Sequence, residues 1–310
     1  MKSLSALILF LAIPSVLFSQ INVEDSTIQV IGYWNLKEKQ SYSVNYEKYK
    51  VKDSKDTVDR EKITYDVDIT VLDSTAKSYT IEWYYKNYQI NSGNSELSKK
   101  MMSIAENVKV IIKTDEYGSF LEVVNDKEVQ DYIKKGISKL KKEFKKTPNI
   151  DVVLKTLENT FSSKEAIQTL AVKDVHQFYT FHGAKYKLGE ELNTTMKQQN
   201  LLGGEPFDVD VTVQMDEMNV NETDDNAVIR MWQVINSDQL TEATIQYLER
   251  LSAQMGTPAP KREDIKPLQN ETRTASRIHG PSGWVIYSIE PKEVWTEGIM
   301  NVEERIIEIK

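Results

Sequence analysis

Residues 63–71, ITYDVDITV, and residues 79–90, YTIEWYYKNYQI, decide the fold of this chain. In the first stretch apolar side chains occupy every second position from Ile63 to Val71, with threonines and aspartates between them. This two-residue period is typical of a strand with one buried face. Residues 73–75, DST, are turn formers between the stretches. The two stretches therefore predict an antiparallel hairpin.

The aromatic side chains of the second stretch divide between the two faces of its strand. Alternation places Tyr84 with the polar residues. The apolar face carries Tyr79, Ile81, Trp83 and Tyr85. These rings could form the wall of a ligand site, a platform that stacks nucleic-acid bases, or the core of a sheet. The formal net charge of −8 disfavours nucleic acid as a partner, because affinity for it comes mainly from neutralising phosphates.

The N-terminus predicts a secretory signal peptide, residues 1–19. Lys2 precedes an apolar run from Leu4 to Phe18, and Ser19 is a small residue at the expected cleavage site. The run is short for a membrane span; a retained anchor helix is the alternative. No later stretch approaches the roughly 18 apolar residues of a span. We therefore expect a periplasmic or secreted mature protein that does not span a membrane.

The chain contains no cysteine. This excludes disulfides, a lipid-modified cysteine anchor, thiol catalysis and cysteine-ligated metals. A secreted protein without disulfides depends on its hydrophobic core, and hydrophobic residues make up 40% of the chain. The length allows one large domain or two small ones.

Five features of the first half recur in the same order in the second half. YDVDITV at 65–71 reappears as FDVDVTV at 207–213, and YTIEW at 79–83 parallels VIRMW at 228–232. The other three are an aromatic-x-Leu-x-Glu pattern from Trp34 and from Tyr186, a helical pattern after the second strand, and a glycine before an aromatic residue, as in Gly118-Ser119-Phe120 and Gly283-Trp284. The shared order favours an internal duplication over coincidence.

We therefore predict an α+β protein built on an internally duplicated antiparallel β-sheet or half-barrel. Each copy would contain three strands, a helix and two further strands. The periodicity of residues 126–181 predicts a helical segment between the copies. VEERIIEIK at 302–310 predicts a final strand. The expected boundaries are 1–19 for the signal peptide, 20–125 for the first β-rich repeat, 126–181 for the helical connector, and 182–310 for the second repeat with the terminal strand.

The histidines do not match a metal-binding motif. His176 and His182 are six residues apart, which does not place them on one helix face, and His279 is distant in the sequence. We expect capping or surface histidines, with His182 in the last turn of a helix that ends at Gly183, where a cation is favoured. No metal and no cofactor is predicted.

Two pairs of aspartates are the other candidates for chemistry. Asp66 with Asp68, and Asp208 with Asp210, could act as paired carboxylates or calcium ligands, but alternate strand positions favour a solvated polar face. The chain has no phosphate loop, dinucleotide fingerprint or HExxH motif. No catalytic residue is assigned, and an unrecognised hydrolase is the third alternative for function.

Two charged features could contact a partner. If VIRMW aligns with YTIEW, Arg230 takes the core-facing position of Ile81, where a guanidinium needs a partner or the anion of a ligand. A slipped register would leave Arg230 exposed. The helix expected at 126–146 carries eight lysines against four acidic residues. Acids first and lysines last suit the helix dipole, but a basic amphipathic helix could also contact an anionic membrane surface.

Several segments resemble parts of uncharacterised secreted bacterial proteins of the domain-of-unknown-function type. They are GYWNLKEKQSYSV from Gly32, TDEYGSFLEVVN from Thr114, SGWVIYSIEP from Ser282 and EERIIEIK from Glu303. The strand-rich plan with helices inside is also similar, in architecture and not in motif, to periplasmic lipoprotein carriers, whose half-barrels hold acyl chains. That likeness implies an apolar ligand, although fold analogy alone does not establish function.

We therefore predict a secreted or periplasmic, non-catalytic protein that binds a hydrophobic or amphipathic ligand such as a lipid. Trp83, Tyr85, Arg230 and Trp232 are predicted to contact it. If Arg230 is buried inside a cavity, it is the best candidate to anchor an acidic head group. The alternative is a structural or partner-binding envelope protein whose aromatic residues are all core. A large apolar cavity beside Trp83, Tyr85 and Trp232 would favour the ligand, and a filled interior the alternative.

Overall fold

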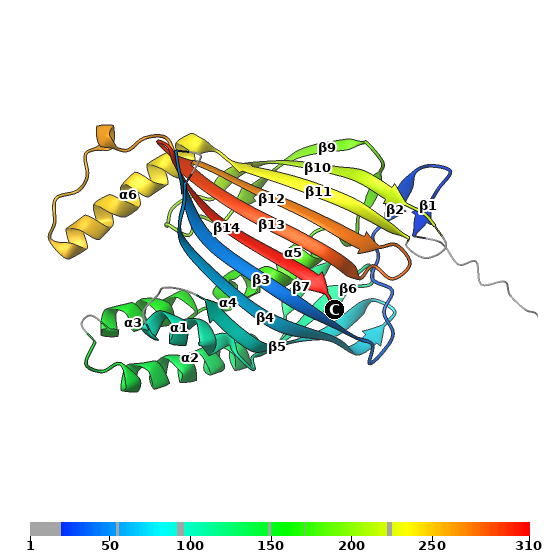
Figure 1. Cartoon of the computed structure of the whole chain (residues 1–310), viewed down its shortest axis with the longest axis horizontal. Coiled ribbons are helices and arrows are strands. Elements are labelled where there is room, and N and C mark those ends of the chain that lie inside the picture. The colour runs from blue at the N-terminus through cyan, green and yellow to red at the C-terminus, as the bar shows by residue number, and fades with distance from the viewer. Residues whose placement is uncertain (1–19, 54–55, 92–95, 148–149, 171, 222–224) are drawn as a thin grey trace, which may run out of the picture.

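The computed structural model describes residues 20–310, except residues 54–55, 92–95, 148–149, 171 and 222–224. The predicted signal peptide lies outside the described residues. The described part is dominated by an antiparallel sheet of eleven strands, which bends around helices on its inner side (Figure 1). Its strands are β3 (Lys39–Lys52), β4 (Asp56–Thr75), β5 (Ser78–Asn91), β6 (Lys109–Asp115), β7 (Phe120–Val123), β9 (Glu191–Gln198), β10 (Phe207–Asn219), β11 (Asn226–Ile235), β12 (Gln269–His279), β13 (Val285–Thr296) and β14 (Ile299–Ile309).

A small sheet connects the start of the described chain to the start of its second half. It contains β1 (Ile21–Asn22), β2 (Thr27–Gln29) and β8 (Lys185–Lys187). Ile28 of β2 lies opposite Tyr186 of β8, and both side chains are buried.

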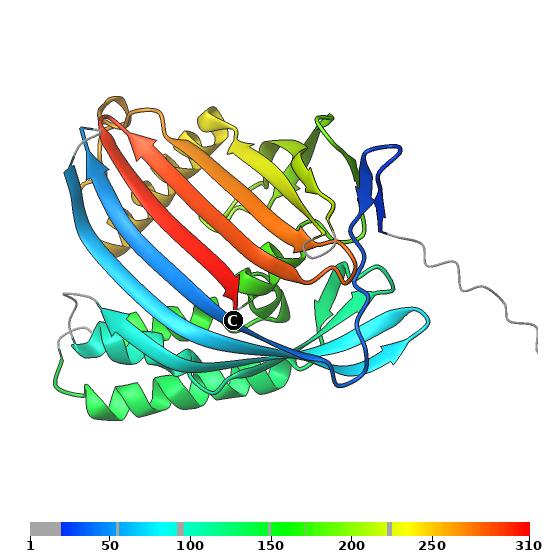
Figure 2. The ribbon, with the colours of Figure 1, turned by 45° about the vertical axis from the view of Figure 1, so that its right-hand side comes forward.

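The large sheet consists of two meanders that meet at β3 and β14. Its strand order is β7-β6-β5-β4-β3-β14-β13-β12-β11-β10-β9. β14 pairs with β3 along its whole length, from Ile299 opposite Lys52 to Ile309 opposite Tyr42, which makes the sheet continuous (Figure 2). The prediction of an α+β protein with a large antiparallel sheet is confirmed in this coarse form, and β14 covers most of the predicted final strand.

The β4–β5 hairpin has the pairing that its sequence predicts. Ile69 lies opposite Trp83, and Val67 lies opposite Tyr85. All four side chains are buried on the inner face, whereas Tyr84 is half-buried on the other face. Burying β-branched and aromatic groups on one face stabilises such a pair of strands.

Helices lie on the inner side of the sheet. They are α1 (Glu96–Met102), α2 (Asp126–Glu143), α3 (Ile150–Thr160), α4 (Lys164–Leu170), α5 (Lys173–Tyr179) and α6 (Ser237–Met255), with the short 3-10 helices η1 (Ser103–Ala105) and η2 (Arg262–Asp264). The segment 126–181 is thus helical as predicted. In Figure 1, α1 to α4 gather below β4 and β5, whereas α6 projects from the other half. No helix in the described ranges combines the length and apolar content needed to cross a bilayer.

α5 inserts an aromatic side chain into the inner face of the sheet. The ring of Phe178 meets those of Tyr42 and Trp83 edge-on, with 5.3 Å between centroids in each pair. Trp34 and Trp284 pack beside them, with their centroids 5.0 Å apart. All five side chains are buried, and edge-to-face contacts of this kind add to the burial of apolar area. The interior around Trp83 is therefore a filled aromatic core.

The element order of the predicted repeat is present in both halves, but the strand register differs. β3, β4, β5, α1, β6 and β7 follow one another in the first half, and β9, β10, β11, α6, β12 and β13 in the second. Ile69 opposes Trp83, whereas its counterpart Val211 opposes Gln233, one residue beyond Trp232. A one-residue offset moves a side chain to the other face of a sheet. The common origin of the halves and the division into domains remain predictions.

Candidate ligand-binding site

α5 lies between two cavities on the inner side of the sheet. The first cavity, of about 270 Å³, is lined by β4, β5, β6 and the helices α1 to α3. The second cavity, of about 650 Å³, is lined by strands β9 and β11 to β14, by α5 and by parts of β3, β7 and α4. Lys173, the first residue of α5, and Arg305, on β14, line both cavities. These two residues therefore mark the boundary between the cavities.

The first cavity has mostly apolar walls. Nine of its fifteen described lining residues are aliphatic, methionine or phenylalanine. These nine are Met101, Ile104, Ala105, Val108, Val110, Val129, Ile133, Leu157 and Phe161. The other six are Tyr65, Tyr85, Tyr88, Lys173, Asp174 and Arg305. The walls can thus exclude water from a hydrocarbon chain while one region offers polar groups.

Tyr65, Tyr85 and Tyr88 form the sheet side of the first cavity, and we call them the tyrosine wall. Simple strand alternation would put Tyr85 and Tyr88 on opposite faces. The β4–β5 pairing has a register shift at Tyr65, and Asn87 has a left-handed backbone with φ of 58°. This bulge returns Tyr88 to the inner face, where its ring stacks on that of Tyr65 with centroids 4.6 Å apart.

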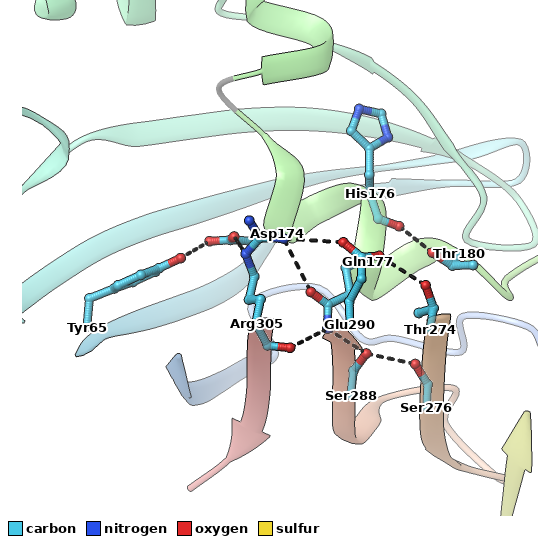
Figure 3. Close-up of polar contacts among 10 residues, drawn as sticks. All are labelled: Tyr65, Asp174, His176, Gln177, Thr180, Thr274, Ser276, Ser288, Glu290 and Arg305. Atoms are coloured by element: carbon cyan, nitrogen blue, oxygen red, sulfur yellow. Dashed lines mark hydrogen bonds and ion pairs between the residues drawn. The ribbon is translucent and has the colours of Figure 1, made fainter. Parts of the chain in front are cut away.

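A buried ion pair joins α5 to the sheet at the boundary of the cavities (Figure 3). Arg305 Nε lies 2.7 Å from Asp174 Oδ1, and the Tyr65 hydroxyl donates a hydrogen bond of 2.6 Å to Asp174 Oδ2. Asp174 is 6% exposed and Arg305 is 8% exposed. Burial disfavours the guanidinium charge, but Asp174 beside it raises the pKa of Arg305 above its usual value. Removing Arg305 would leave the Asp174 carboxylate as an uncompensated buried charge.

Further polar contacts extend this pair across the neighbouring strands (Figure 3). Gln177 Nε2 donates to Ser288 Oγ at 3.0 Å and to the Arg305 carbonyl oxygen at 3.2 Å. The Thr274 hydroxyl donates to Glu290 at 3.0 Å, and Glu290 lies 3.4 Å from Arg305 Nη1. Because buried polar groups are costly unless they are paired, this network fixes the position of α5 on the sheet.

Tyr85 differs from its neighbour Tyr65 in having no partner. Its side chain is 5% exposed, and its hydroxyl makes no hydrogen bond with any described residue. Burial, and next the charge of Asp174, raise the pKa of Tyr85, so that the hydroxyl stays protonated and can donate. An unpaired buried hydroxyl costs about 1–3 kcal/mol. A polar atom of a ligand in the first cavity would remove this cost.

Residues with polar or charged groups predominate around the second cavity. Sixteen of its nineteen described lining residues carry such a group, and the other three are Phe120, Met196 and Met231. The charged ones are Lys173, Glu290, Lys292, Glu303 and Arg305. The cavity is larger than the first, and carbon atoms of its side chains line it as well, so the two cavities differ in the charged groups of their walls and not in the presence of apolar surface.

The two neighbouring histidines lie in different surroundings. His182 follows α5 and is buried, so the prediction that it lies in the last turn of the helix as a favoured cation is wrong. Its Nε2 is 2.8 Å from the Gly283 carbonyl oxygen, and burial lowers its pKa to about 4. His176 is exposed, and its Nε2 lies 2.6 Å from the Gln168 carbonyl oxygen. The described residues contain no group of three or more histidine, aspartate or glutamate side chains that could hold a metal ion.

The structure separates the four residues that the sequence predicts to contact a ligand. Tyr85 lines the first cavity, whereas Trp83 is fully buried in the aromatic core. Arg230 and Trp232 lie on the outer face, because the offset of β11 turns them away from the inner side. Arg230 forms an ion pair with Asp216 there. The expectation that Trp83 and Trp232 share a face is therefore wrong, and contact of Tyr85 with a ligand stays a prediction.

The sequence interpretation missed the charged residues of the boundary. Asp174 and Arg305 come from distant parts of the chain, and no spacing links them. One signal was present for Arg305, because strand alternation places it on the same face as Ile307 and Ile309. A charged residue within an apolar face indicates a buried partner.

Three of the four predicted aspartates, Asp66, Asp68 and Asp208, take part in ion pairs of the sheet, whereas Asp210 is exposed. Asp68 is buried and not solvated, contrary to expectation. Burial alone would raise its pKa, but hydrogen bonds from Lys39, Lys86 and Ser41 lower it to about 2. Asp208 lies 2.5 Å from Lys197 Nζ. Neither contact indicates catalysis.

The lysine-rich helix α2 packs through its apolar side. Val129, Ile137 and Leu140 are buried, while its lysines are exposed. Lys141 lies 2.9 Å from Asp151 of α3. These contacts account for the fold of the helix, and its contact with an anionic membrane surface stays a prediction.

No protein-family model and no curated protein matches the chain. Among solved structures, it is similar to a lipovitellin chain studied under the heading "Lipid-protein interactions in lipovitellin", with 10% sequence identity and a TM-score of 0.39. The likeness covers 90% of this chain and 25% of the lipovitellin chain, so this chain spans about a quarter of that protein. A likeness at this TM-score carries no inference about what the chain binds.

Proposed function

We propose that the protein binds a single-chain apolar or amphipathic molecule in the first cavity. The observation that carries the proposal is an apolar cavity of about 270 Å³ whose wall contains the buried, unpartnered hydroxyl of Tyr85. Small-molecule sites usually measure roughly 300–1,000 Å³. A volume of about 270 Å³, just below this range, suits one hydrocarbon chain better than a two-chain lipid.

The chemistry of the cavity supports a ligand with two unlike ends. Each methylene group that leaves water contributes about 0.8 kcal/mol, and the apolar walls under α1 to α3 supply the surface for this transfer. The polar residues lie together at the boundary with α5, where Asp174 is held by Arg305 and Tyr65. A chain in the apolar part would place its polar end near this boundary.

The alternative, a structural protein whose aromatic residues are all core, accounts for the aromatic core and not for the first cavity. The aromatic core around Trp83, Phe178 and Trp284 is filled, as that alternative expects. The first cavity lies beyond this core. Of the four residues predicted to contact a ligand, Tyr85 lines this cavity. A filled core and the first cavity therefore occur side by side on the inner face of the sheet.

Fluorescence titration with 1-aminoanthracene, a neutral probe of apolar cavities, tests the proposal. We expect saturable binding to one site per chain, reversed by dodecanol. Native mass spectrometry of protein purified gently from its own host should show a bound single-chain molecule. The absence of saturable probe binding, or binding that dodecanol does not reverse, would contradict the proposal.

We also propose that this binding takes place in the periplasm or outside the cell. The support is the basic start, apolar run and small residue of positions 1–19. N-terminal sequencing of the protein from its own host should then begin at Gln20. A mature protein that still begins at Met1 would contradict the localisation without affecting the ligand proposal.

A further inference from the structure

The carboxylates at the boundary of the cavities already have cationic partners. Asp174 and Glu290 lie 2.7 and 3.4 Å from the Arg305 guanidinium. Glu303 lies 3.4 Å from Lys48 Nζ. Arg305 is thus engaged by two acids, and it is not the cation that an incoming ligand would meet unpaired.

Lys173 is the boundary cation without a close counter-ion. Within the described ranges, no carboxylate lies within the ion-pair distance of 4.0 Å from its Nζ. Lys173 is exposed and lines both cavities. Partial desolvation lowers its pKa, and the charges of Glu303 and Glu290 oppose this effect. An anion in the first cavity beside Lys173 would gain an ion pair that the ligand-free protein lacks.

Tyr85 and Lys173 both line the first cavity. The Tyr85 hydroxyl has no hydrogen-bond partner among the described residues, and no described carboxylate lies within ion-pair distance of the Lys173 ammonium. The walls of this cavity therefore include one hydroxyl donor and one ammonium donor that a ligand could engage. A hydrogen bond from a charged donor to an anion is about twice as strong as one between neutral groups.

We infer that the ligand of the first cavity carries an anionic head group, a carboxylate or a phosphate ester, which binds Lys173 while its chain lies along the tyrosine wall. The inference rests on the proposed function and specifies its ligand. Lys173 supplies the charge, and the Tyr85 hydroxyl donates a hydrogen bond to the same head group or to the first polar atom of the chain.

Competition against 1-aminoanthracene tests the inference with dodecanoate, dodecyl phosphate and dodecanol. At least one anion should bind the wild-type protein about tenfold more tightly than dodecanol. K173M should abolish this preference, measured as the ratio of anion to dodecanol affinity, whereas K173R should keep it. K292M is the matched control, because Lys292 lines the second cavity alone and its loss should not alter the preference.

The outcomes separate the inference from the proposed function. Equal binding of all three competitors to the wild-type protein would overturn the inference and leave the proposed function standing. A preference for anions that survives K173M, or that K292M removes instead, would overturn it as well. Failure of dodecanol and both anions to displace the probe would contradict the proposed function itself. A preference for one anion over the other would identify the head group as carboxylate or phosphate ester.

Discussion

The two cavities beside α5 share one sheet but differ in the chemistry of their walls. Nine of fifteen described residues that line the first are apolar, whereas sixteen of nineteen that line the second are polar or charged. The difference follows from what covers the sheet. Helices α1 to α3 turn apolar side chains towards the first half, while α5 and the bare strands β9 and β11 to β14 enclose the second. The covering segment, and not the sheet alone, therefore decides which side chains line each cavity.

The largest effect on stability is expected from breaking the ion pair between Arg305 and Asp174 at the boundary of the two cavities. Arg305→Met leaves the Asp174 carboxylate buried without its partner, and such losses cost about 3–5 kcal/mol. Urea unfolding should show this decrease, and the double variant with Asp174→Asn should recover part of it. Arg262→Met is the matched control, because Arg262 pairs with Glu242 on the surface, where ion pairs contribute little to stability, so its effect should be much smaller. Equal effects of the two arginine variants would contradict the role of Arg305.

A pH effect next to the second cavity is expected to be of similar size. The folded pKa of His182 is about 4, below the roughly 6.5 of an unfolded chain. Because the unfolded state takes up the proton first, the stability from His182 is complete above pH 6.5 and is lost as the pH falls to about 4. The loss is on the order of 3 kcal/mol. The free energy of unfolding, measured between about pH 4 and 6.5, should depend less on pH in His182→Gln than in the wild-type protein. Identical pH dependence in both proteins would contradict the role of His182.

A smaller effect distinguishes the cavities by ligand binding. Ala105→Phe fills the first cavity, and Thr180→Phe places the same ring in the second. We expect the first variant to bind 1-aminoanthracene at least about tenfold more weakly and the second to bind it like the wild-type protein. The stability of Ala105→Phe should change by no more than about 2 kcal/mol, since filling a void adds contacts. Loss of binding in Thr180→Phe alone would place the ligand in the second cavity.

The smallest effect concerns two tyrosines of the same wall. Tyr65→Phe removes a hydroxyl that donates to Asp174, and should lower the unfolding free energy by about 1–3 kcal/mol. Tyr85→Phe removes a hydroxyl without a partner, so the ligand-free protein should be as stable as the wild type or slightly more stable. Thermal unfolding measures both changes. Destabilisation of the ligand-free protein by Tyr85→Phe to the same extent as by Tyr65→Phe would show that its hydroxyl is already satisfied.

Local patterns predicted the elements of the fold well. The two-residue period of residues 63–71 and 79–85 was sufficient for the β4–β5 hairpin and its buried face, because that period directly reflects strand geometry. The three-to-four-residue period of 126–181 was sufficient for its helices. Both signals depend only on neighbours in the sequence.

The site depends on features that local patterns do not contain. The bulge at Asn87 adds one residue to β5, and alternation therefore fails to place Tyr88. A one-residue offset in the second half puts Trp232 on the outer face, although its sequence matches that of Trp83. The pairing of Asp174 with Arg305 exists only because β14 returns to lie beside β3. Register and long-range pairing, which fix these positions, are properties of the assembled sheet.

Anomalous diffraction from crystals of the complex with 12-bromododecanoate tests the central claim most directly. The bromine marks the end of the chain, and the carboxylate marks the head. We predict a bromine peak in the first cavity among Ile104, Ile133 and Phe161, with the carboxylate towards Tyr85 and Lys173. Bromine located only in the second cavity, or only on the outer face of the sheet, would contradict ligand binding between the tyrosine wall and the helices.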